Sequence, residues 1–141
     1  MTSQKLEELG AILAESRIIA VVGLSPNPER ESHSIAHYLQ QQGYRIIPVN
    51  PKAAEILGEK SYLSLRDIPE LVDVVLVFRK PEAVPSIVED AIAIGAKVIW
   101  MQVGIVHEAA SKRARSAGMQ VVMNTCMRAT HKLLQASDLA H

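Results

Sequence analysis

The chain has 141 residues, of which 48% are hydrophobic and 21% charged, and its 15 basic and 15 acidic residues give a formal net charge of +0 at pH 7. This length suits a single domain over residues 1–141, and the balanced charge excludes a general electrostatic attraction to nucleic acid or to an anionic membrane. No apolar run reaches the roughly 20 residues that a membrane span needs. The chain has a single cysteine, Cys126, and residues 1–8 show no signal-peptide pattern. These two features predict a cytoplasmic protein.

Runs of β-branched residues alternate along the chain with segments of helical periodicity, which is typical of βαβ units around a parallel sheet. Strands are predicted at 18–23, 45–49, 74–78, 97–101 and 120–123. Helices are predicted at 3–15, 32–42, 81–94, 107–117 and 128–139, with a short helical turn at 65–69. The fold class is therefore α/β, a three-layer, Rossmann-like (doubly wound) five-stranded parallel sheet flanked by helices.

The first predicted strand ends at Gly23, and a polar loop over 24–32 then opens directly into a helix. In a parallel sheet this arrangement directs backbone N–H groups and the positive end of a helix to one point, which suits a phosphate. However, Ser25 and Arg30 stand where a dinucleotide fingerprint has further glycines. The loop therefore predicts a nucleotide-type ligand other than NAD.

The second predicted strand ends at Asn50, Pro51 and Lys52, where NAD-binding enzymes usually have an acidic residue that accepts from the ribose hydroxyls. A lysine at this position can pair with a phosphate on the ribose, as in NADP or in coenzyme A (CoA). A ribose-phosphorylated adenine nucleotide is thus favoured over NAD. The alternative is that Lys52 is an ordinary solvated lysine.

The other strand ends add further polar candidates, because ligands of doubly wound sheets bind beyond the carboxyl ends of the strands. These candidates are Ser32 and His33 at the first helix, Phe78 and Arg79 after the third strand, Gln102 and Gly104 after the fourth, and Asn124 and Cys126 after the fifth. Turns are polar in any protein, so the convergence on one edge matters more than any single residue. His33 either contacts the ligand or is an ordinary exposed histidine.

Five segments in this order resemble the small CoA-binding protein family, which is similar to the N-terminal CoA-binding domain of the succinyl-CoA synthetase alpha subunit. The segments are Val-Gly-Leu-Ser (22–25), Pro-Val-Asn-Pro-Lys (48–52), Asp-Val-Val-Leu-Val-Phe-Arg (73–79), Trp-Met-Gln-Val-Gly-Ile (100–105) and Asn-Thr-Cys-Met (124–127). The resemblance covers about 18–133, and it implies a Rossmann-like fold that holds CoA or an acyl-CoA.

Several residue roles follow from the resemblance alone. It implies that Ser25, Arg30 and Ser32 hold the CoA phosphates and that Lys52 faces the 3′-phosphate. Phe78 and Arg79 would line the cleft, and Met101, Gln102, Val103 and Gly104 would border the pantetheine. The second alpha-subunit domain with its phosphorylated histidine has no counterpart in this sequence.

We therefore expect non-catalytic binding of CoA or acyl-CoA, as a sensor or carrier, by a monomer or homodimer that can dock on a larger CoA-using enzyme. The alternative is an NADP-dependent oxidoreductase or an acyl-CoA-using enzyme. Cys126 and His131 lack an orienting third group, so a structural cysteine is favoured, with a CoA mixed disulfide as the intermediate possibility. Two histidines, His33 and His37, make a weak metal signal, and no metal is predicted.

Overall fold

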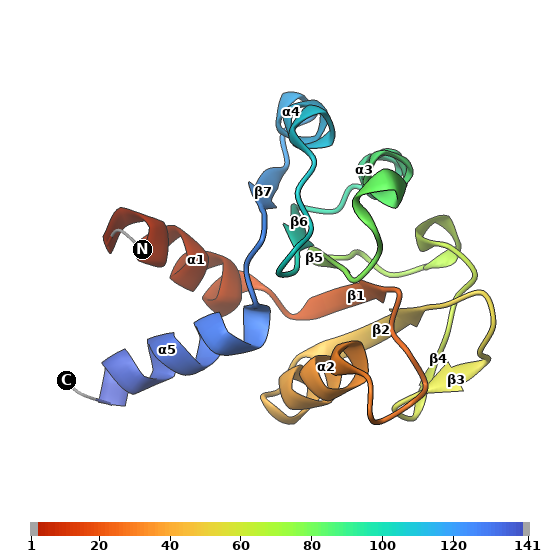
Figure 1. Cartoon of the computed structure of the whole chain (residues 1–141), viewed down its shortest axis with the longest axis horizontal. Helices are drawn as coiled ribbons and strands as arrows, with labels where there is room; N and C mark the ends of the chain where they lie inside the picture. Colours follow the sequence, from red (N-terminus) through yellow and green to blue (C-terminus); the bar gives the residue numbers. More distant parts are fainter. Residues whose placement is uncertain (1–2, 140–141) are drawn as a thin grey trace.

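Within residues 3–139, which the computed structural model describes, five parallel strands form one sheet in the order β2-β1-β5-β6-β7 (Figure 1). The strands are β1 (Ile18–Val22), β2 (Arg45–Val49), β5 (Val74–Val77), β6 (Val98–Met101) and β7 (Gln120–Val122). The predicted α/β doubly wound fold is confirmed. The strand predictions are too long by one residue each at Gly23, Phe78, Lys97 and Met123.

The helices also follow the prediction closely. They are α1 (Ser3–Glu15), α2 (Glu31–Gln41), α3 (Val84–Ala93), α4 (Glu108–Ser116) and α5 (Met127–Leu139). The predicted helix at 81–94 begins as a 3-10 turn, η2 (Pro81–Ala83), and the turn predicted at 65–69 is η1 (Leu65–Asp67). None of the described helices is long and apolar enough to cross a lipid bilayer.

Alternate residues of each strand face opposite layers, because successive side chains of a strand point to opposite sides of the sheet. Ala20, Val75 and Ile99 pack with α3, α4 and η1. Ile19 and Trp100 pack instead with α1, α2 and α5. Figure 1 shows α1 and α5 side by side at the end of the molecule where both termini lie. Burial on both faces explains why the strands read as continuous hydrophobic runs.

A small hairpin between β2 and η1 has no counterpart in the prediction. It pairs β3 (Glu55–Ile56) with β4 (Glu59–Lys60) in antiparallel fashion. Its turn residues Leu57 and Gly58 have φ values of +56° and +75°. Strands of two residues are too short for a periodic pattern, and a Leu-Gly turn lacks the Asn-Gly or Asp-Gly signal of such hairpins.

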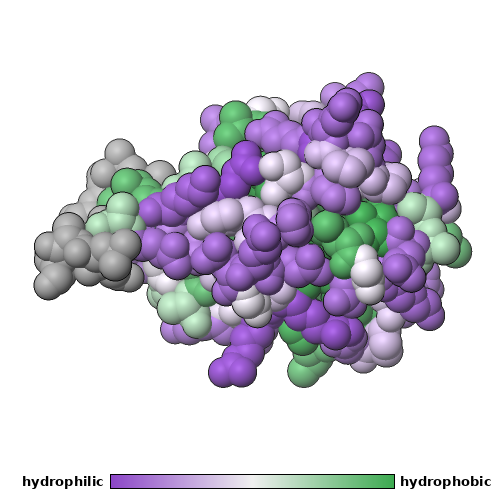
Figure 2. Space-filling model, turned by 90° about the horizontal axis from the view of Figure 1, so that it is seen from below, coloured by the Kyte–Doolittle hydropathy of each residue, from purple (hydrophilic) through white to green (hydrophobic). Residues whose placement is uncertain are grey.

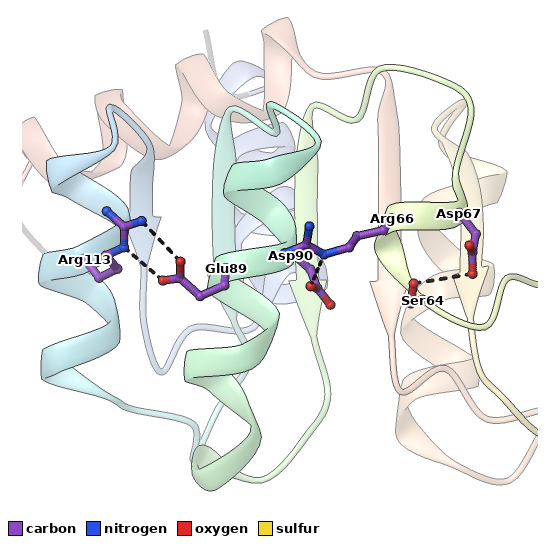
Figure 3. Close-up of polar contacts among 6 residues, drawn as sticks. All are labelled: Ser64, Arg66, Asp67, Glu89, Asp90 and Arg113. Carbon is purple, nitrogen blue, oxygen red and sulfur yellow. Dashed lines mark hydrogen bonds and ion pairs between the residues drawn. The ribbon is translucent and has the colours of Figure 1, made fainter.

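The surface is largely hydrophilic on the side seen from below in Figure 1, with a hydrophobic area on the half away from α1 and α5 (Figure 2). On the face of the sheet that α3, α4 and η1 cover, ion pairs join α3 to its two neighbours (Figure 3). The Arg113 guanidinium donates to both carboxylate oxygens of Glu89, joining α4 to α3, and Arg66 Nε donates to Asp90 Oδ1 at 2.7 Å, joining η1 to α3. These pairs are exposed, and exposed ion pairs add little to stability.

Candidate functional site

A cleft of about 1070 Å³ opens at the carboxyl ends of β1, β2 and β5. The chain passes from β1 to β2 on one side of β1 and then crosses to β5 on its other side, so this is the point where the strand order reverses. Open α/β sheets bind their ligands at such a switch point. The volume lies just above the range of about 300–1,000 Å³ that is typical of small-molecule sites.

Nine of the residues selected from the sequence line this cleft. They are Gly23, Ser25, Arg30, Ser32, Asn50, Pro51, Lys52, Phe78 and Arg79. They come from the ends of three strands and from the start of α2. The strand order therefore brings together residues that are up to 56 positions apart in the sequence.

Gly23 lines the cleft where the end of β1 approaches the end of β5. Its φ is +89°, and its N–H donates to the carbonyl of Val49 at 3.1 Å. A Cβ at this position would stand 2.8 Å from the carbonyl oxygen of Phe78 and 3.0 Å from Cδ of Arg79. Both the left-handed backbone and the close approach require glycine here.

The loop between Gly23 and α2 is held by its own side chains. Ser32 Oγ accepts from the backbone N–H of Ser25 at 3.0 Å, and Ser25 Oγ accepts from that of Asn27 at 3.1 Å. His33 Nδ1 donates to the Ser25 carbonyl at 2.9 Å, although His33 itself does not line the cleft. Ser32 and His33 therefore position Ser25 within the loop.

The start of α2 meets the cleft without a side-chain cap. Arg30 is the N-cap residue, and its side chain makes no capping hydrogen bond. The first N–H groups of a helix have no partner within the helix, and together with the helix dipole they favour an anion. Glu31 and Ser32 of this first turn both line the cleft.

Asn50 joins the loop after β2 to the loop after β1. Its Nδ2 donates to the Leu24 carbonyl at 2.9 Å, and its Oδ1 accepts from the Lys52 backbone N–H at 2.8 Å. Both ends of the amide are thus engaged within the protein. Asn50 fixes the backbone from which the Lys52 side chain projects.

Four cationic side chains line the cleft: Arg30, Lys52, Arg79 and Lys80. None of them forms an ion pair with another residue in the described part of the chain. The acidic lining residues are Glu31 and Glu82. The cleft therefore has an excess of unpaired positive charge, although the chain as a whole is neutral.

Sequence reasoning missed Lys80 and several other lining residues. The further ones are Pro26, Glu31, Leu63, Glu82, Ala83, Ser86 and Ile87, together with Val22 and Val49. The signal for Lys80 was present, because it directly follows Arg79 at the end of the third strand. Leu63 carried no signal, because only long-range packing brings it to the end of β2.

The residues predicted at the ends of β6 and β7 do not line the cleft. The Met101 side chain is fully buried, and Gln102 Oε1 accepts from the Met127 N–H at 2.9 Å, so it caps the start of α5. Asn124, with φ of +51°, accepts from the Gly104 N–H through Oδ1 at 2.7 Å. Met101, Gln102, Val103, Gly104, Asn124 and Cys126 are thus not among the residues that line the cleft.

Cys126 is half-buried immediately before α5, where its carbonyl accepts from Thr130. His131 is engaged elsewhere: its Nδ1 is hydrogen-bonded to the Tyr38 hydroxyl at 2.7 Å, and the Tyr44 ring lies edge-on to it. Burial holds the pKa of His131 below its ordinary value. The geometry gives no nucleophile and base pair from Cys126 and His131.

Comparison with known proteins identifies a family and several relatives of this chain. The sequence profile of a family described as CoA binding domain matches residues 17–132. The chain is 40% identical over 131 residues to the uncharacterized protein YneT of Bacillus subtilis, covering 93% of this chain and 97% of that protein. It is also similar to a structure of a hypothetical protein from Pyrococcus horikoshii, with 44% identity, a TM-score of 0.90 and coverage of 92% of both chains.

Larger enzymes contain a related segment. The chain is 35% identical over 74 residues to acetate–CoA ligase (ADP-forming) I of Archaeoglobus fulgidus. The matched segment covers 52% of this chain but only 11% of that protein. The chain is also similar to a structure of dinucleotide forming acetyl-coenzyme A synthetase 1 from Ca. Korarchaeum cryptofilum in complex with phosphate and ADP. The match covers 74% of this chain and 25% of the synthetase chain, with 30% identity and a TM-score of 0.67. The resemblance drawn from the five sequence segments is confirmed.

Proposed function

The chain belongs to the CoA binding domain family, and from this premise we propose that it binds CoA or an acyl-CoA in the cleft at the ends of β1, β2 and β5. The observation that carries the proposal is the set of unpaired cations, Arg30, Lys52, Arg79 and Lys80. CoA carries a diphosphate bridge and a third phosphate on its ribose. Charge-assisted hydrogen bonds to these groups would satisfy cations that have no acidic partner within the described residues.

In this proposal the diphosphate lies against the start of α2. The uncapped N–H groups of the first turn, the Ser25 loop and Arg30 are the donors on that side. Arg79 approaches from β5, where its side chain passes over Gly23. Ser32, His33 and Asn50 act through the backbone that they hold, as positioning residues.

Lys52 is the proposed partner of the ribose 3′-phosphate. The Asn50 amide fixes its backbone, and its ammonium is unpaired within the described residues. A lysine here favours a ribose-phosphorylated nucleotide over NAD. Pro51 and Phe78 complete the walls on either side.

The pantetheine arm is proposed to leave the cleft toward the end of β6. Val103 and Gly104 are exposed there, and Val103 has 65% of its surface exposed. Met101 is buried and Gln102 caps α5, so they would support this path from beneath. Asn124 holds the Gly104 backbone, and Cys126 follows β7, the last strand in the sheet order, immediately before α5.

We further propose that the protein binds its ligand without catalysing a reaction, as a sensor or carrier of CoA. The Archaeoglobus relative is a CoA ligase of which this chain matches 11%. Docking on a larger CoA-using enzyme, as a monomer or homodimer, would fit such a role.

Isothermal titration of the purified protein with CoA, dephospho-CoA, NADP and NAD tests the proposal. We expect CoA to bind, dephospho-CoA to bind more weakly, and NAD not to bind. A preference for NADP would favour an oxidoreductase instead. Absence of binding to all four ligands would refute the proposal.

A further inference from the structure

The last helix of the chain packs against the helix that opens at the cleft. The chain runs from β7, at one edge of the sheet, directly into α5 (Figure 1). Helix α5 contacts α2, although α2 follows β1, which is separated from β7 by β5 and β6. No described residue of α5 lines the cleft, whereas the first turn of α2 does. This contact therefore joins the cleft to a part of the molecule outside it.

Arg128 makes the polar contact between α5 and the first turn of α2. Its Nη1 donates to Ser34 Oγ at 2.7 Å, across 94 positions of the sequence. Ser34 completes the first turn of α2, because its N–H donates to the Arg30 carbonyl at 3.1 Å. Arg128 forms no ion pair with an acidic residue in the part of the chain that the structure describes. The guanidinium is thus held at this turn by a neutral hydroxyl.

The first turn of α2 in turn holds the loop that lines the cleft. Ser32 Oγ accepts from the Ser25 N–H, and His33 Nδ1 donates to the Ser25 carbonyl. Arg30, Ser32 and Ser25 all line the cleft. A shift of this turn would therefore move all three lining residues together.

Helix α5 is a firm support for this turn. Met127, its first residue, is fully buried, and its N–H donates to the Gln102 side chain at 2.9 Å. One turn farther along both helices, the Tyr38 hydroxyl is hydrogen-bonded to His131 Nδ1 at 2.7 Å. These contacts fix α5 against the core and against the body of α2. Arg128 extends the same support to the end of α2 that meets the cleft.

We propose that Arg128 is a positioning residue for the cleft. Through Ser34 it holds the first turn of α2, and with it the Ser25 loop, in the arrangement that receives the ligand's diphosphate. The proposal rests on the proposed function, because it takes an anionic ligand to meet this turn. The physical reason is preorganisation: donors that are already held in their bound positions lose less conformational freedom when the ligand arrives. Arg128 itself does not contact the ligand.

The test removes each end of the hydrogen bond separately and measures binding of CoA and dephospho-CoA by isothermal titration. Ser34→Ala removes the acceptor without changing the charge, and Arg128→Ala removes the donor together with a positive charge. Each should weaken CoA binding by about threefold to tenfold. Dephospho-CoA, which keeps the diphosphate, should show the same losses. The double variant should lose no more than Arg128→Ala alone, because both changes break one contact.

Two further variants separate position from charge. Arg128→Lys keeps a donor and the charge, so it should bind CoA more tightly than Arg128→Ala does. Lys132→Ala removes a positive charge one turn farther along α5, where the ammonium lies over the Tyr38 ring, and should leave CoA binding close to that of the wild type. Urea denaturation checks that each variant is folded.

The positioning itself is measured without ligand, by hydrogen exchange of the backbone amides of residues 25–34. Ser34→Ala and Arg128→Ala should speed exchange in this segment and leave the amides of β5 as protected as in the wild type. Unchanged exchange would overturn the positioning role whatever the ligand is.

Three titration results would also overturn the inference. The first is wild-type affinity in Ser34→Ala, and the second is an equal loss in Lys132→Ala, which would assign the effect to charge. The third is additive losses in the double variant, which would mean that Arg128 does not act through Ser34. Failure of the proposed function looks different, because the wild type would then bind neither CoA nor dephospho-CoA while the exchange result stands.

Discussion

Gly23 at the end of β1 lies so close to Phe78 at the end of β5 that a Cβ on Gly23 would stand 2.8 Å from the Phe78 carbonyl oxygen. The two residues adjoin the strand pair at which the sheet order reverses. Both residues line the cleft.

Gly23→Ala should therefore lower the free energy of unfolding for two reasons, the left-handed φ and the contact with Phe78. The first effect alone costs about 1–2 kcal/mol. Gly43→Ala is a matched control, because Gly43 has φ of +99° and no atom within 4 Å of the added Cβ. Urea denaturation should show the larger loss for Gly23→Ala. Equal losses would mean that the Phe78 backbone yields without cost.

Lys52→Ala should weaken CoA binding by about tenfold to a hundredfold, because a charge-assisted contact with the 3′-phosphate is lost. Binding of dephospho-CoA, which lacks this phosphate, should barely change. Isothermal titration of both ligands measures the difference, with Lys112→Ala on α4 as the control for the loss of a lysine away from the cleft. Equal losses for the two ligands would rule out the assigned role of Lys52.

Asp73 should make folding sensitive to acid. Partial burial acts to raise the pKa of its carboxyl, but the N–H groups of Ile18 and Arg17, both 2.9 Å from Oδ2, and the nearby Lys97 ammonium together lower that pKa below 3.8. A carboxyl whose pKa is lowered by folding stabilises the protein above its unfolded pKa, and this contribution is lost as the pH falls below it.

The measurement is urea denaturation of the wild type and Asp73→Asn at a series of pH values. The variant should be less stable than the wild type at neutral pH, and the gap should narrow as the pH falls below about 3.8. Asp67→Asn is the control variant. Within the described residues, the Asp67 carboxylate accepts a hydrogen bond only from the exposed Ser64 hydroxyl (Figure 3). A constant gap for Asp73→Asn across this range would contradict the prediction.

His131 should add a second pH dependence at milder acidity. Burial lowers its pKa below 6.5, and it contacts Tyr38 and Tyr44, while Arg128 and Lys132 on the same helix lie close to Tyr38. Burial penalises the charged form of the imidazole. The folded state therefore favours neutral His131, and its stability should fall as the pH drops through 6.5.

His131→Gln should remove much of that pH dependence, because glutamine keeps a polar partner for the Tyr38 hydroxyl but does not titrate. His37→Gln, at an exposed histidine of α2, should leave the dependence intact. Thermal unfolding between pH 7.5 and pH 5 would compare the three proteins. The same decline in all three would show that another group is responsible.

Much of the site was predictable, because residues that follow buried strands of a parallel sheet meet at one edge. Gly23, Asn50 and Arg79 were selected on this ground and line one cleft. The same reasoning also selected Gln102 and Asn124, which do not line the cleft. Their side chains bond to backbone N–H groups of α5 and of the loop after β6, and these partners lie 25 and 20 residues away in the sequence.

The sequence by itself determined the alternation of strands and helices and the polar character of the strand ends, because local periodicity and turn chemistry act over a few residues. Only the tertiary structure decided which strand ends are neighbours. The order β2-β1-β5 brings Lys52 and Arg79 to the same cleft, and the pairing of Tyr62 with Val49 brings Leu63 to its rim. Strand order is set by long-range packing of the two hydrophobic layers, which no local pattern encodes.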